Sequence, residues 1–157
     1  MKKIFQWALA AFCLCWLAAC QPKIIYETYK EIDQRSWNKD SLAVFEIPVT
    51  DTTHNFDLYI NVRNDVNYNY SNLWLFVTIE EPDGKSVEDK FEITLAEPSG
   101  KWMGEGMGGL KTREVLYRRN IFFPSSGNYT ITLQQGMREN VLKGISDVGV
   151  RIERVKN

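Results

Sequence analysis

Cysteine is nearly absent from this sequence. The chain has three cysteines in 157 residues, Cys13, Cys15 and Cys20, and all of them fall in its first 20 positions. The rest of the chain has no thiol, which excludes disulfides, thiolate catalysis and cysteine-ligated metals from it. A fold built from that part must therefore be held together by the burial of apolar side chains.

Histidine and excess positive charge are also scarce. His54 is the only histidine, and it lies in the polar stretch Asp51–Asn55, where we expect an exposed loop residue rather than part of a catalytic triad or zinc site. The 19 basic and 20 acidic side chains give a net charge of −1. Nucleic-acid binding is not expected, because it requires a basic surface that displaces counterions from phosphates.

The N-terminal segment has the pattern of a bacterial lipoprotein signal. Lys2 and Lys3 precede an apolar run that ends in Leu17-Ala18-Ala19-Cys20. The run is too short to span a membrane, and two small residues before a cysteine are typical of a processing site. We therefore predict a cleaved signal peptide over residues 1–19 and acylation (palmitate) at Cys20, which attaches the protein stably to a membrane.

The residues after Cys20 indicate which membrane carries the protein. Gln21 follows the cysteine instead of an aspartate, which by resemblance to other bacterial lipoproteins permits transfer to the outer membrane. The stretch after it also lacks the acidic run that surface-exported lipoproteins resemble one another in carrying. We therefore predict that the protein is located at the periplasmic face of the outer membrane. Residues 20–29 are interpreted as the lipid-anchored tether and residues 30–157 as one domain, a size that suits a single core.

Alternating apolar and polar residues dominate the chain from Leu42 onward. Phe56-Leu58-Ile60-Val62 alternate with polar neighbours, which predicts a strand with one wet face. Both faces of Leu73–Ile79 are apolar, so we expect that strand to be covered on both sides. The turn sequences Glu81-Pro82-Asp83-Gly84 and Glu97-Pro98-Ser99-Gly100 should end strands. Further strands are expected over 87–96, 113–123, 129–133 and 148–152.

These short strands predict an all-β fold, an antiparallel sandwich of about seven to eight strands. A jelly roll and an immunoglobulin-like arrangement both fit. Residues Gln134–Ile145 should form a single helical turn or an ordered loop, since they tolerate helix and end at Gly144.

Two features that resemble catalytic motifs have simpler interpretations. The stretch Gly104–Gly109 opens no helix and lacks the Lys-Ser/Thr ending of a phosphate-binding loop, so we interpret it as a crossover loop that needs positive φ or close packing. The carboxylates of residues 80–92 alternate along one hairpin, which suits a solvated face better than the facing pair of a glycosidase. The basic cluster of residues 111–119 has two interpretations: it pairs with these carboxylates across neighbouring strands, or it steers a charged partner.

Aromatic residues leave a glycan-binding alternative open. Trp37, Trp74 and Trp102, with Tyr68 and Tyr70, would form a sugar-stacking platform if they were exposed together. We expect Trp74 in the core and Trp102 as the most exposed of the tryptophans.

Charged residues near the C-terminus form a second candidate site. Arg138, Asp147 and Arg151 bring charge to a segment that we place at the edge of the core. One hypothesis is a partly buried Arg–Asp clasp that ties the loop Gln134–Ile145 to the last strand. The other places Arg138, with the Gly104–Gly109 loop and Trp102, at one end of the sandwich, where it contacts a partner protein.

Several motifs in this order resemble a known family. They are Trp37-x-Lys39-Asp40, Trp74 through Pro82-Asp83-Gly84, Trp102-x-Gly104-x-Gly106, Phe123-Pro124-x-x-Gly127-x-Tyr129, Gln135-x-Met137-Arg138 and Leu142-x-Gly144-Ile145-x-Asp147-Val148-Gly149-x-Arg151-Ile152. Behind a lipoprotein signal, this set resembles the gliding-motility lipoproteins GldH of the Bacteroidetes.

The resemblance implies a function without catalysis. Its members support surface gliding and the associated type IX secretion machinery, with no known catalytic centre, cofactor or metal. The expected partners are the membrane and other envelope lipoproteins of motility or secretion, and no small-molecule substrate is expected. Trp102, Arg138, Asp147 and Arg151 are the candidate partner-binding residues.

Overall fold

A computed structural model describes residues 23–155, which form ten β-strands and one three-residue 3₁₀ helix, η1 (Asp33–Arg35). The signal peptide and Cys20 lie outside the described residues. The strands are β1 (Ile24–Glu31), β2 (Ser36–Asn38), β3 (Ala43–Val49), β4 (Asn55–Asp65), β5 (Asn72–Glu80), β6 (Ser86–Thr94), β7 (Leu110–Phe122), β8 (Gly127–Gln135), β9 (Val141–Lys143) and β10 (Ile145–Arg154). Between Lys23 and Val155, no helix is long and apolar enough to cross a membrane.

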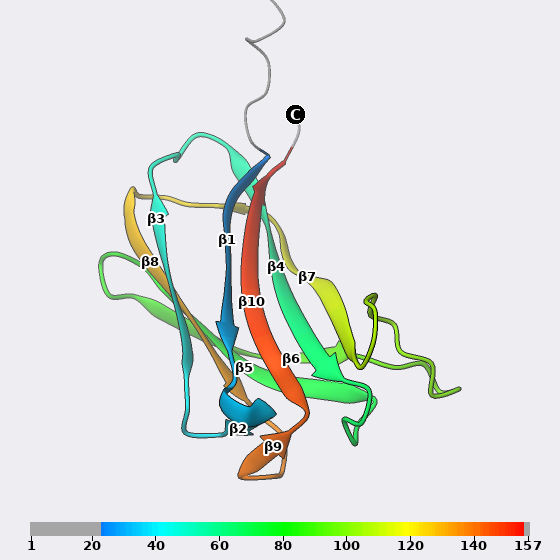
Figure 1. Cartoon of the computed structure of the whole chain (residues 1–157). Helices are drawn as coiled ribbons and strands as arrows, with labels where there is room; N and C mark the ends of the chain where they lie inside the picture. Colours follow the sequence, from blue (N-terminus) through cyan, green and yellow to red (C-terminus); the bar gives the residue numbers. More distant parts are fainter. Residues whose placement is uncertain (1–22, 156–157) are drawn as a thin grey trace, which may run out of the picture.

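The strands pair as one long hairpin folded over on itself. β1 pairs with β10, β2 with β9, β3 with β8, β4 with β7 and β5 with β6, all antiparallel. Further pairing of β10 with β4 and of β5 with β8 gives two four-stranded sheets, β1-β10-β4-β7 and β3-β8-β5-β6. The short ribbon β2-β9 lies at the end opposite the start of β1 (Figure 1).

This strand order decides between the two predicted topologies. Without the ribbon, the eight long strands have the orders 1-8-3-6 and 2-7-4-5, which is the arrangement of a jelly roll and not of an immunoglobulin domain. The predicted antiparallel β-sandwich is confirmed, with two strands more than expected.

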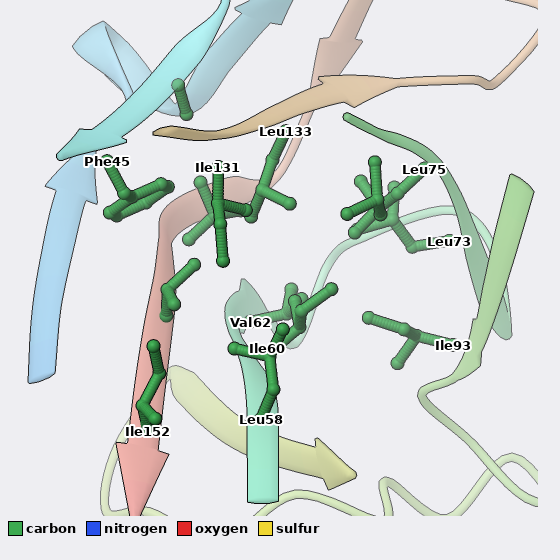
Figure 2. Close-up of a cluster of buried hydrophobic side chains, with 14 of the residues drawn as sticks. Phe45, Leu58, Ile60, Val62, Leu73, Leu75, Ile93, Ile131, Leu133 and Ile152 are labelled. Carbon is green, nitrogen blue, oxygen red and sulfur yellow. The ribbon is translucent and has the colours of Figure 1, made fainter. Parts of the chain in front are cut away.

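The core lies between the inner faces of the two sheets. Figure 2 shows buried aliphatic and aromatic side chains from both sheets directed into the same space. Leu58, Ile60 and Val62 of β4 and Leu73 and Leu75 of β5 are among them, each at most 1 % exposed. Burial of a large apolar side chain contributes about 1.5–3 kcal/mol, so this layer stabilises the domain without disulfides.

The predicted alternation of residues 56–62 is confirmed, but that of β5 was misjudged. Leu73, Leu75 and Val77 point into the core, whereas Trp74 is 39 % exposed and Phe76 half-buried on the outer face. Only one face of β5 packs against the second sheet. An apolar residue at an outward position therefore does not by itself mean a second covering layer.

Two segments that we interpreted otherwise contain strands. Residues 24–29, interpreted above as tether, make up most of β1, which pairs with the central strand β10 over its whole length. Within Gln134–Ile145 there is no helical turn but an ordered loop followed by β9. Leu142 of β9 is buried opposite Trp37 of β2, and this packing accounts for the extended conformation.

The predicted turns and the glycine loop have the expected roles. The N–H of Gly84, with φ +87°, donates to the carbonyl of Glu81, and this turn joins β5 to β6. Gly106 has φ +146°, and a Cβ atom there would lie 2.6 Å from the carbonyl oxygen of Leu110. The loop therefore carries the chain from one sheet to the other with a glycine that no other residue can replace without strain.

The acidic hairpin and the basic strand are not adjacent in one sheet. The predicted pairing across neighbouring strands would require them to be. β6 and β7 are edge strands of different sheets, and they meet across the open side of the sandwich. Arg118 binds Asp89 at 2.7 Å, and the rings of Tyr117 and Phe91 lie edge to face 5.0 Å apart. These contacts close that side of the sandwich.

Candidate functional site

The four predicted partner-binding residues lie in three places. Asp147 and Arg151 both project from the outer face of β10. Arg138 is exposed in the loop between β8 and β9, and Trp102 is half-buried against the core, where its backbone bridges Ala96. The structure therefore brings together only Asp147 and Arg151.

The predicted clasp between Arg138 and the last strand is wrong. Asp147 pairs with Arg63 on β4, and Arg151 pairs with Glu114 and Glu153, so these partners are on the sheet and not on the loop. The loop is held instead by an internal bond, from the Gln135 amide to the carbonyl of Glu139 at 2.8 Å, and by bonds to Trp74 and Tyr70.

Asp147 and Arg151 belong to a larger polar and aromatic surface, which we call the arginine–tyrosine face. Strand alternation exposes one side of the sheet β1-β10-β4-β7, because the other side points into the core. The arginine–tyrosine face consists of Tyr29, Tyr59, Asn61, Arg63, Glu114, Asp147, Gly149, Arg151 and Glu153.

The middle row of this face contains a glycine, Gly149, which leaves room for a neighbouring ring. Tyr29, Gly149, Asn61 and Glu114 lie opposite one another across the four strands. A Cβ atom on Gly149 would lie 2.7 Å from Cδ1 of Tyr29, so the glycine lets the tyrosine ring lie against the sheet. The guanidinium of Arg63 reaches over the same ring, 5.8 Å from its centroid.

Asn61 is an unusual residue at the centre of the face. It is only 1 % exposed, and within the described part of the chain neither atom of its side-chain amide has a hydrogen-bond partner. Burying an amide without a partner costs about 1–3 kcal/mol. The face thus contains a polar group that contributes nothing visible to the stability of the sheet.

Arg151 is fixed by contacts on three sides. Its guanidinium donates to Glu114 at 2.6 Å and to Glu153, and it lies 5.0 Å from the centroid of the Tyr59 ring. Burial lowers the pKa of Arg151, but the hydrogen bonds to Glu153 and the charge of Glu114 outweigh this and raise it above its usual range. The arginine is a permanent, immobilised positive charge.

Glu153 connects this face to the start of the described chain. Its buried carboxylate accepts from Lys23 at 2.7 Å and from the Tyr59 hydroxyl at 3.1 Å. Burial raises the pKa of Glu153, but the hydrogen bonds from Lys23, Arg151 and Tyr59 lower it below its usual range. The carboxylate is therefore ionised at neutral pH.

The tyrosines of the face are poor acids. Burial and the nearby Glu27 raise the pKa of Tyr29, and burial with the hydrogen bond to Glu153 raises that of Tyr59. Both phenols stay protonated near neutral pH. The face offers fixed charges, aromatic rings and hydrogen-bond donors, which suit recognition of another molecule rather than proton transfer.

A second surface, which we call the aromatic groove, lies on the outer face of the other sheet. It has a volume of about 510 Å³ and is lined by Tyr70, Asn72, Trp74, Leu75, Phe76, Lys90, Gly136, Met137 and Arg138. This size is in the range of ligand sites. Arg138 thus belongs to the groove and lies apart from Asp147 and Arg151.

The tryptophans are not distributed as predicted. Trp74, expected in the core, is exposed in the groove, whereas Trp102, expected to be the most exposed, packs partly against the core. Trp37 and Tyr68 are buried. The five aromatic residues therefore do not form one platform, and only Trp74 and Tyr70 share a surface.

The remaining candidates have structural roles. His54 lies in a turn in which its Nδ1 is 2.8 Å from Oδ2 of Asp51, and the side chain is 40 % exposed. A backbone N–H from Thr53 and the contact with His54 hold the pKa of Asp51 well below its usual range. In residues 23–155, no group of three or more His, Cys, Asp or Glu side chains could hold a metal ion.

Seven residues of the arginine–tyrosine face were not among the partner-binding residues predicted from the sequence, namely Tyr29, Tyr59, Asn61, Arg63, Glu114, Gly149 and Glu153. Tyr59, Asn61 and Arg63 alternate with buried residues of β4, which marks them as outward-facing but does not show that they meet Asp147 and Arg151. Tyr29 was missed because β1 was interpreted as a tether. The pairing of β1 with β10 is what places it there.

Comparison with known proteins identifies the family. A family model described as GldH lipoprotein matches residues 24–152, nearly all of the described chain. The chain belongs to the GldH lipoprotein family. It is 38 % identical over 164 aligned positions, covering 100 % of both chains, to a protein of Christiangramia forsetii named gliding motility lipoprotein GldH homolog. It is 36 % identical to the gliding motility lipoprotein GldH of Flavobacterium johnsoniae, over 88 % of this chain and 89 % of that protein. The resemblance found in the sequence is confirmed.

Proposed function

We propose that this protein is a non-enzymatic envelope lipoprotein that supports gliding motility and the associated type IX secretion machinery by binding other proteins of the envelope. The names of its relatives support the role in gliding motility. The lipoprotein signal before Cys20 supports a lipid anchor, and Gln21 supports the periplasmic face of the outer membrane.

The arginine–tyrosine face is the observation that carries this proposal. Arginine and tyrosine are enriched among the residues that dominate binding energy at protein interfaces. Tyr29, Arg63 and Arg151 are already held by ring contacts and ion pairs, so little side-chain freedom would be lost on binding. Of the predicted residues, Asp147 and Arg151 would contact the partner, whereas Trp102 and Arg138 would not contribute to this face.

The position of the face fits a partner that is itself at the membrane. Lys23 binds Glu153 at one end of the face, and Lys23 is the third residue after Cys20. An extended chain of that length spans about 10 Å. A partner on this face would thus be bound close to the lipid anchor, and other envelope lipoproteins of motility or secretion are the expected class.

Co-purification from the native envelope tests the proposal. The full-length lipoprotein, extracted in detergent, should bring down a protein partner in stoichiometric amount by mass spectrometry. The double variant Tyr29→Ser, Arg63→Gln should lose at least about 90 % of that partner, because the variant removes two central contact residues. Glu46→Gln is the matched control, since Glu46 is exposed on β3 of the other sheet.

Two results would contradict the proposal. One is retention of the partner by the double variant at the wild-type level, provided that its far-ultraviolet circular dichroism is unchanged. The other is recovery of glycan without stoichiometric protein, which would favour a binding module over an assembly protein.

A further inference from the structure

The floor of the aromatic groove is a row of side chains on β5, next to Tyr70 from the segment before that strand. Asn72, Trp74 and Phe76 follow one another at every second position of β5, so they point to the same side. Trp74 is the most exposed large aromatic residue in the groove. An exposed tryptophan beside a second ring is a flat apolar surface that water solvates poorly.

The loop after β8 forms one wall of the groove and fixes its shape. The N–H of Gly136 donates to the carbonyl of Trp74 at 2.7 Å, and the N–H of Trp74 donates to Sδ of Met137 at 3.3 Å. A Cβ atom on Gly136 would lie 3.2 Å from Cε2 of Phe76, so this glycine allows the loop to lie close to the aromatic row. Met137 and Arg138 are thereby positioned beside Trp74.

The rim of the groove carries both donors and acceptors of hydrogen bonds. Lys90 lies opposite Phe76 on β6, with its ammonium 5.5 Å from the ring centroid. Beside the groove, the carboxylate of Glu92 accepts from Asn72 at 2.6 Å, and that of Glu139 accepts from Tyr70 at 2.7 Å. The side chains are thus held in place without a ligand.

No carboxylate in residues 23–155 forms an ion pair with Lys90 or Arg138. Their donors remain available to a ligand. The carboxylates of Glu92 and Glu139 each have a second oxygen that can accept. The groove therefore has two cations in its lining and two anions beside it, bonded to the lining residues Asn72 and Tyr70.

We infer that the aromatic groove binds a neutral polysaccharide chain. A sugar ring has apolar C–H faces, which fit against the rings of Trp74 and Phe76, and hydroxyl groups, which both donate and accept hydrogen bonds. A rim with Lys90, Arg138 and the two carboxylates satisfies both kinds of bond. This activity is separate from the proposed protein contact, since it uses the opposite sheet.

Other ligand classes match the groove less well. A polyanion would be repelled by Glu92 and Glu139, which lie beside the groove. A peptide could not be added as a strand, because both edges of β5 are already paired, with β6 and with β8. The balance of charges and the closed backbone of β5 therefore favour the saccharide.

Binding of neutral hexasaccharides to the full-length protein in detergent tests the inference. Calorimetry or tryptophan fluorescence should detect a complex with at least one of three probes at millimolar concentration, namely the β-1,4-glucose, β-1,4-N-acetylglucosamine and β-1,3-glucose hexamers. Trp74→Ala should weaken it by at least about 10-fold, as expected for loss of a central tryptophan. Trp74→Tyr should retain part of the affinity, because a ring remains.

The control is Phe122→Ala, which removes a 54 % exposed aromatic side chain from outside the groove and should leave binding unchanged. Three results would overturn the inference: no binding of any neutral hexamer by the wild type, equal binding by Trp74→Ala, or stronger binding of polyglutamate or polygalacturonate. Trp74→Ala should still co-purify the protein partner, so failure here leaves the proposed function standing.

Discussion

At the scale of single residues, the buried amide of Asn61 is the least explained feature of the arginine–tyrosine face. Asn61→Leu should raise the free energy of unfolding by about 1 kcal/mol, because it removes a buried group without hydrogen bonds and keeps the size of the side chain. Urea denaturation measures the change.

Asn64 is the matched control for this substitution. It is also 1 % exposed and on β4, but its amide donates to the carbonyl of Asp65 at 3.0 Å. Asn64→Leu should therefore destabilise the protein by about 1–2 kcal/mol. Equal destabilisation by both variants would mean that the Asn61 amide has a partner in solution.

Glu153 should make the protein sensitive to acid. Its pKa is lower in the folded protein than in the unfolded chain, where a glutamate has a pKa of about 4.3. Its contribution to stability is therefore present above about pH 4.3 and is lost as the pH falls through the lower folded value. Glu153→Gln should reduce stability at pH 7 and flatten this part of the pH profile, as measured by thermal unfolding from pH 3 to 7.

Glu46→Gln serves as the comparison, since this glutamate is exposed on β3 of the other sheet and its replacement should leave the profile unchanged. If the stability of Glu153→Gln fell with decreasing pH as steeply as that of the wild type, the acid sensitivity would come from other carboxylates. Of these, Asp51 has a strongly lowered pKa.

At the scale of elements, β1 differs most from the interpretation of the sequence, which placed residues 24–29 in a tether. Its pairing with β10 and the packing of Tyr26 against the core make it part of the sheet. Replacing residues 24–29 by a Gly/Ser linker should lower the free energy of unfolding by at least about 2 kcal/mol, since apolar burial and a central pairing are both lost. Chemical denaturation would measure this.

A linker of four Gly/Ser residues inserted between Pro22 and Lys23 is the control, and it should not change the stability. If the replacement of residues 24–29 were equally neutral, these residues would act as a tether and not as a strand of the sheet.

At the scale of the whole molecule, both ends of the described chain lie at the same end of the sandwich, opposite the ribbon β2-β9 (Figure 1). The N–H of Arg154 donates to the carbonyl of Lys23 at 2.7 Å. With a lipid on Cys20, this end would face the membrane and the ribbon would point away from it.

The anchor itself can be tested by substitution. Cys20→Ala should abolish incorporation of a radiolabelled fatty acid and release the protein from the membrane fraction, because the acylated thiol is gone. Cys15→Ala, within the same signal segment, should be labelled as the wild type is. If the Cys20→Ala protein were still labelled, the acyl chain would be attached to another residue.

The sequence determined those features that depend on neighbouring residues. The alternation of residues 56–62, the turn at Glu81–Gly84 and the predicted anchor at Cys20 follow from patterns a few residues long, and the ordered motifs identified the family. Such patterns are local because side-chain direction and turn geometry are set by adjacent dihedral angles.

Only the tertiary structure decided what depends on pairing between distant segments. Period-two alternation cannot say which apolar face is covered, and so Trp74 was placed in the core. The jelly-roll order and the arginine–tyrosine face both require β1 to pair with β10, although Tyr29 and Gly149 are far apart in the chain. The register of such pairs is fixed by the packing of the whole core, which no short stretch of sequence encodes.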